Sequence, residues 1–162
     1  MAKDAVARLR AAQGYAELGM LDAAWTELKA IGGPAQRHLD LDVLATEIVL
    51  LIKEDRWQDG YDCSQKLLRL KSDCTAGFIH GAFCLHELGR TEEAREWLRS
   101  GPAKLRKEAV YHYNLACYRA VLGKRKSARK SLRRAIRIDP SYRYTAKNDP
   151  DLERLRKRDT DD

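Results

Sequence analysis

A short pattern recurs along the chain at a nearly constant spacing, and it restricts the fold more than any other feature. Three copies contain a Leu-Gly pair, at Gly19, Gly89 and Gly123, and a fourth copy has Asp55 at the same point. These four residues are 36, 34 and 34 positions apart. A constant period of about 20–50 residues indicates stacked structural repeats. The sequence therefore predicts an array of about four similar units.

The residues around each turn predict a pair of helices. Good helix formers dominate the sequence, and Val and Ile rarely alternate with polar residues as they would in a strand. Glycine can adopt the left-handed conformation that ends a first helix, and a small residue five positions later lets a second helix cross closely. These small residues are Ala24, Gly60, Ala94 and Ala128. We therefore predict an all-α fold, which explains the pattern better than a helical bundle with accidental self-similarity.

We expect helices at residues 4–18, 21–31, 38–54, 57–70, 75–88, 91–100, 105–122 and 125–138. A last helix should begin with Asp149 as its N-cap and Pro150 as its first helical residue. Its Leu152 and Leu155 should face inward and its charged residues outward. Such a helix would cap the end of the array.

The repeat resembles that of the tetratricopeptide-repeat (TPR) family, over about residues 5–140 and most clearly in the fourth copy. The resemblance implies a right-handed α-solenoid in which four helix-turn-helix repeats are followed by a capping helix. We expect one domain over residues 1–162, with repeats at about 5–36, 38–72, 75–102 and 108–140 and a cap at about 141–158. The second repeat departs from the family pattern because it lacks the turn glycine. The closing run of residues 146–155 is similar to the end of many bacterial proteins of this type.

In this family the first helix of each repeat lines a concave surface that binds peptides. The resemblance carries this role to a largely apolar row of residues: Leu9, Gln13, Ala45, Val49, Ile52, Ile79, Phe83, His86, Tyr113, Cys117 and Ala120, with Asn114 adjacent. An exposed apolar row favours binding of a partner. The alternative is that some of these side chains only fill the solenoid or meet the capping helix. The Lys and Asn residues with which related repeats clamp acidic chaperone termini are not found at the matching positions.

The positive charge of the chain is concentrated in its last third. Residues 1–100 have 13 Lys and Arg against 16 Asp and Glu, whereas residues 101–162 have 18 against 8. One face of the last long helix is expected to be basic, convex and solvent-exposed. Its residues are Lys126, Arg129, Lys130, Arg133 and Arg137. This face could bind an acidic partner or a phosphate backbone. A merely solvated helix face is the simpler explanation.

The sequence contains no motif for catalysis or for nucleotide phosphates, so we expect neither an enzyme nor a cofactor. The best metal candidates are His80 and Cys84, one helical turn apart, with Cys117 or His112 on the next repeat. Cysteines on apolar helix faces are more simply explained as buried thiols, so we predict no metal. Cysteines without a disulfide pattern fit a reducing cytoplasm, and no apolar segment is long enough for a membrane span.

These features together predict a cytoplasmic adaptor that binds a peptide or an amphipathic helix of another protein in an apolar groove. A chaperone that shields an apolar segment is a special case. The alternative is nucleic-acid binding through the basic face, which we consider unlikely because few aromatic residues accompany it. We expect a monomer or a weak homo-oligomer.

Overall fold

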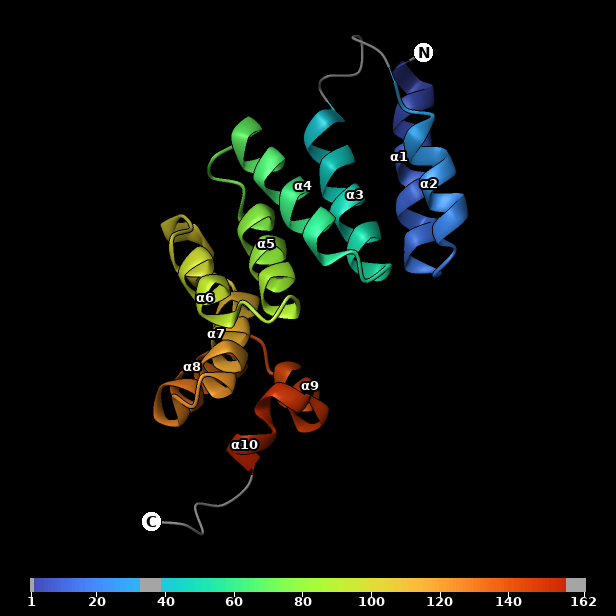
Figure 1. The fold of residues 1–162 in the computed structure, drawn as a ribbon. Coiled ribbons are helices and arrows are strands. Elements are labelled where there is room, and N and C mark those ends of the chain that lie inside the picture. Colours follow the sequence, from blue (N-terminus) through green and yellow to red (C-terminus); the bar gives the residue numbers. More distant parts are fainter. Residues whose placement is uncertain (1, 33–38, 157–162) are drawn as a thin grey trace. The chain divides into compact units, whose positions relative to one another are not determined.

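The computed structural model describes residues 2–32 and 39–156, and the chain divides into two compact units, Met1–Cys84 and Leu85–Asp162. In the first unit α1 (Ala2–Glu17) packs on α2 (Leu21–Lys29), and α3 (Asp40–Lys53) packs on α4 (Trp57–Leu70) (Figure 1). Helix α5 (Thr75–Glu87) begins in this unit. No strand occurs in the two described ranges, so the predicted all-α class is confirmed.

The second unit continues the pattern of paired helices. It contains α6 (Thr91–Arg99), a 3₁₀ helix η2 (Ala103–Lys107), and α7 (Ala109–Val121) packed on α8 (Arg125–Ile138). The chain then forms α9 (Tyr142–Asn148), η3 (Pro150–Leu152) and α10 (Glu153–Arg156). None of the helices in the part of the chain that the structure describes is long and apolar enough to cross a membrane.

The four turn residues identified in the sequence share one backbone conformation. The φ angles of Gly19, Gly89 and Gly123 are 75°, 77° and 75°, and that of Asp55 is 57°. After each turn a backbone N–H bonds back to a carbonyl five residues earlier, as from Arg56 to Leu51 at 2.9 Å. This is the Schellman closure of a helix C-terminus. The second repeat therefore keeps the turn of the others although it lacks their glycine.

The small residues after the turns are all buried. Ala24, Ala94 and Ala128 are fully buried, and Gly60 is buried as well. A Cβ atom added at Gly60 would lie 2.8 Å from Cys84 Sγ, so no larger residue fits without movement of the cysteine. All four positions are buried, as a close helix crossing requires, while the crossing itself stays a prediction.

One expected helix boundary was wrong, and one helix was missed. The helix expected from residue 105 begins at Ala109, because Glu108 is extended (φ −84°, ψ 135°) and separates it from η2. The sequence also predicted no helix at Tyr142–Asn148, where α9 forms. Residue 38, where a helix and the second repeat were expected to begin, lies outside the described residues, as do part of the first repeat (5–36) and the end of the cap (to 158). The single domain and the repeat boundaries stay predictions.

The expected cap at Asp149 and Pro150 is confirmed, although it starts a 3₁₀ helix. Asp149 Oδ1 accepts the backbone N–H of Asp151 at 3.0 Å, and Pro150 occupies the first position of η3. Leu152 is buried, whereas Glu153 and Arg154 are exposed. The segment thus has the inward apolar and outward charged sides expected of a cap.

Candidate functional site

A hollow of about 340 Å³ lies in the first unit and is lined only by the first helices of the pairs. Its walls come from α1, α3 and α5, and the lining residues are Gln13, Ala16, Glu17, Ala45, Thr46, Val49, Lys53 and His80. Three of the predicted groove residues, Gln13, Ala45 and Val49, therefore lie around one concavity. Its volume is at the lower end of the range of small-ligand pockets, about 300–1,000 Å³.

Polar and apolar side chains line this hollow together. Gln13 Nε2 donates to Thr46 Oγ1 at 3.2 Å, and Thr46 Oγ1 donates to the carbonyl of Asp42 at 2.8 Å. Within the described ranges the amide oxygen of Gln13 accepts no hydrogen bond. Burial lowers the pKa of His80, which keeps its ring neutral at neutral pH. The hollow thus offers both hydrogen-bonding groups and an apolar surface.

The other predicted groove residues of this unit have different surroundings. Leu9 is buried in a core cluster with α2 and α3, so its side chain fills the solenoid. Ile52 packs half-buried against the core cluster of Ile48. Ile79 is half-buried, and the ring of Phe83 meets Trp57 edge-on with centroids 5.8 Å apart. The peptide-binding role of these residues stays a prediction.

In the second unit the C-terminal segment covers the predicted groove residues. Tyr113 Oη donates to Asp149 Oδ2 at 2.5 Å, and Cys117 Sγ contacts the same oxygen at 3.6 Å. His86 Nε2 lies 2.9 Å from Asp151 Oδ2. Tyr113 and Cys117 are buried, as is the adjoining Ala120, whereas Asn114 is half-buried. Tyr113, Cys117 and His86 therefore meet the C-terminal segment, which is the alternative raised by the sequence.

Cys117, Asp149 and Asp151 bring three potential metal ligands within 4.8 Å of one another. Asp149 accepts bonds on both oxygens, and Asp151 is paired with His86. Burial and the neighbouring carboxylates raise the pKa of Cys117, which favours the protonated thiol over the thiolate that binds metals. The arrangement is therefore explained by hydrogen bonds alone. It includes neither His80 nor Cys84, the metal candidates of the sequence.

The predicted basic face is split between two environments. Lys130, Arg133 and Arg137 line a hollow of about 700 Å³ between α7 and α8. Lys126 is exposed outside this hollow, and Arg129 Nη2 donates to the carbonyl of Leu155 at 3.5 Å. The face expected to be convex therefore borders a concavity on one side. Nucleic-acid binding and plain solvation both stay predictions for it.

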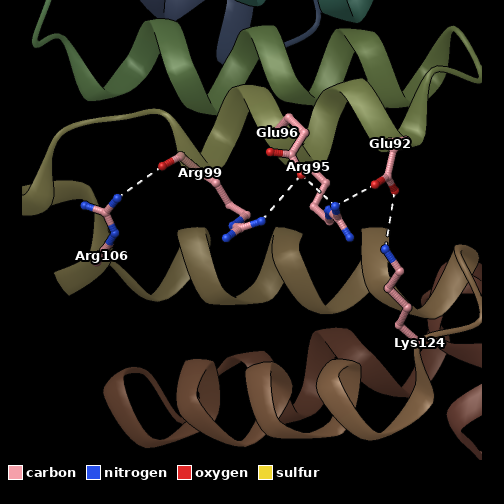
Figure 2. A network of polar contacts seen from close by, with 6 residues as sticks. All are labelled: Glu92, Arg95, Glu96, Arg99, Arg106 and Lys124. Carbon is pink, nitrogen blue, oxygen red and sulfur yellow. Dashed lines mark hydrogen bonds and ion pairs between the residues drawn. The ribbon is translucent and has the colours of Figure 1, made fainter.

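An ion-pair network on α6 is built around Glu92 and Glu96 (Figure 2). Arg95 Nη2 lies 2.5 Å from Glu92 and 2.6 Å from Glu96, and Glu92 also meets Lys124 at 3.6 Å. The side chain of Arg106 donates to the carbonyl of Arg99 at 3.1 Å. The network links α6 to η2 and to the turn before α8. Its carboxylates pair with Arg95, Arg99 and Lys124, and not with the cations that line the hollow between α7 and α8.

Helix pairs joined by left-handed turns and crossing at small residues define a helical-repeat protein of the α-solenoid class. Residues 109–142, which contain α7, the Gly123 turn and α8, match the family model of the tetratricopeptide repeat. This match supports the tetratricopeptide repeat that the sequence predicts most clearly for its fourth copy. A search of curated proteins gives no match. TPR repeats generally mediate protein–protein interaction, and the family is a scaffold rather than an enzyme class.

The sequence missed Thr46 and His80 as neighbours of the groove residues, and Arg106 and Arg119 as neighbours of the basic face. Thr46 is a buried residue of α3, and the sequence suggested His80 as a metal candidate and not as a groove residue. The available signal was their nearness in sequence to predicted groove residues: Thr46 follows Ala45, and His80 follows Ile79. Arg106 and Arg119 are distant in sequence from the face on α8, so no local pattern could reveal them.

Proposed function

We propose that the chain is an interaction adaptor that binds a peptide or an amphipathic helix of another protein. The hollow lined by α1, α3 and α5 carries this proposal. It places predicted groove residues from consecutive repeats around one concavity, which is how stacked repeats form a binding surface.

The chemistry of the hollow suits one protruding apolar side chain with adjacent backbone. Ala16, Ala45 and Val49 supply apolar contacts, while the amide of Gln13 can accept a backbone N–H. Glu17 and Lys53 also line the hollow with opposite charges, which suits a partner with charges of both signs near its apolar residue. A chaperone-like role would use the same contacts to shield such a segment. The thiol state of all four cysteines supports a reducing compartment such as the cytoplasm.

The proposal is tested by selecting peptides from a displayed random library on the whole chain. Selected peptides are then titrated by fluorescence anisotropy against the parent and the Val49→Glu variant. A carboxylate in place of this apolar lining residue should weaken binding by about tenfold or more. Leu70→Glu is the matched control, since Leu70 is an apolar residue that is exposed outside the hollow. We expect this control to bind like the parent. Failure to select any peptide, or equal binding by both variants, would refute the proposal.

A further inference from the structure

The hollow between α7 and α8 has an unusual concentration of positive charge. Six of its eleven lining residues are cationic: Arg106, Arg119, Lys130, Arg133, Arg134 and Arg137. No lining residue is Asp or Glu. The cations come from three elements, since Arg106 lies on η2, Arg119 on α7 and the other four on α8. They therefore converge on one concavity, unlike the charges of a solvated helix face.

The charges of this hollow are not neutralised within the described residues. Lys130, Arg133, Arg134 and Arg137 form no ion pair there, whereas Arg95, Arg99 and Lys124 are paired with Glu92 or Glu96 (Figure 2). Like charges held close together repel one another, and a bound anion relieves this repulsion.

Arg119 is the anchor of the site. Its Nη1 donates to Ser131 Oγ at 2.6 Å, and Ser131 is itself buried, so the guanidinium is held in place from α8. Burial lowers the pKa of Arg119, and the charges of Arg99 and Arg95 lower it further. The protein therefore keeps a partly desolvated guanidinium among the other cations that line the hollow. A fixed planar guanidinium suits the paired oxygens of a phosphate.

We infer that this hollow binds the phosphate groups of a small polyanion, either a free oligophosphate or the phosphate chain of a nucleotide. Its volume of about 700 Å³ is large enough for such a ligand. The exposed hydroxyl of Ser127 adds a further donor at the wall. The site lies in the second unit and does not depend on the peptide hollow of the first.

Isothermal titration calorimetry of the whole chain with tripolyphosphate, at about 0.15 M salt, tests the inference. The double variant R133Q/R137Q removes two exposed charges of the hollow and should weaken binding by about tenfold or more. The double variant K126Q/R143Q is the matched control. It removes two exposed charges outside the hollow and should bind within about threefold of the parent.

A second titration with adenosine triphosphate distinguishes the two sources. Equal affinities assign the site to oligophosphate alone, and tighter binding of the nucleotide assigns it to nucleotides. Circular dichroism verifies that the variants are folded. The inference is overturned if neither ligand binds at this salt concentration. Duplex DNA is titrated as a further polyanion. The inference is also overturned if both double variants lose affinity equally for tripolyphosphate or for the DNA, because the net charge of the protein and not the hollow would then attract the anion.

Discussion

Tyr113 Oη donates a hydrogen bond of 2.5 Å to Asp149 Oδ2, and this bond joins α7 to the C-terminal segment. Burial and the carboxylate raise the pKa of Tyr113, so its hydroxyl remains protonated and able to donate at neutral pH. The other oxygen of Asp149 accepts the backbone N–H of Asp151 at 3.0 Å. One carboxylate thus both caps η3 and fixes it against the face of α7.

Replacing Asp149 with Ala should lower the free energy of unfolding by about 2–3 kcal/mol, because it removes a helix cap and leaves the Tyr113 hydroxyl without its acceptor. Tyr113→Phe removes only the hydroxyl and should cost about 1 kcal/mol. Urea denaturation followed by circular dichroism measures both. If the two variants were equally stable, Asp149 would not act as a cap.

Gly60→Ala should destabilise the protein by about 1–3 kcal/mol, because the new methyl group would lie 2.8 Å from the buried Cys84 Sγ. Gly14→Ala is the matched control within α1. Its methyl group would have no neighbour within 4 Å, so we expect stabilisation by about 0.5–1 kcal/mol. Thermal melting of the two variants shows the opposite signs.

Adding Cys84→Ala to Gly60→Ala identifies the clash as the cause. The double variant has room for the methyl group, so the cost of Gly60→Ala should be smaller in the Cys84→Ala background than in the parent. If the two changes were simply additive, the close contact at this crossing would not be the source of the instability.

The turns and crossings could be predicted from sequence because each depends on one local requirement. A left-handed turn requires a residue that tolerates positive φ, and a close crossing requires a small side chain. Helix α9 could not be predicted, because Tyr142, Thr145 and Asn148 have weak helix propensity. It lies where the ring of Tyr142 packs on Tyr113, with centroids 4.6 Å apart. That contact joins residues far apart in sequence.

The candidate sites were predictable to different degrees for the same reason. The family pattern indicates which face of a first helix points to the groove, and this placed Gln13, Ala45 and Val49 around one hollow. It does not indicate what covers that face, so contact with the cap was only an alternative, and the bond of Tyr113 to Asp149 could not be identified from the pattern. The basic spacing on α8 was visible in the sequence. Its convergence with Arg119 depends on how α7 and α8 pack.

Asp55→Gly should stabilise the protein by up to about 1 kcal/mol, because glycine adopts the positive φ of this turn without strain. Gly123→Ala should have the opposite effect and cost about 1–2 kcal/mol, since it introduces a Cβ at a φ of 75°. Differential scanning calorimetry compares the two. A destabilised Asp55→Gly variant would show that the aspartate side chain contributes more than its backbone strain costs.

The four cysteines should differ in their reaction with iodoacetamide. Cys63, Cys84 and Cys117 are buried, and burial raises the pKa of the Cys63 thiol to about 12. Because the thiolate is the nucleophile, the half-buried Cys74 should be modified first under native conditions. Peptide mass spectrometry over time measures the four rates, and a denatured sample, in which all four should react, is the control. Early modification of Cys63 would contradict its burial.

Acidification should destabilise the first unit through His80. Burial lowers the pKa of this histidine below its ordinary 6.5, so between the lowered pKa and 6.5 the unfolded chain binds more protons than the native one. Stability is therefore complete above pH 6.5 and falls as the pH decreases through this window. Melting temperatures at several pH values should decrease less steeply for His80→Gln than for the parent. Parallel curves for the two proteins would show that His80 is not buried in its neutral form.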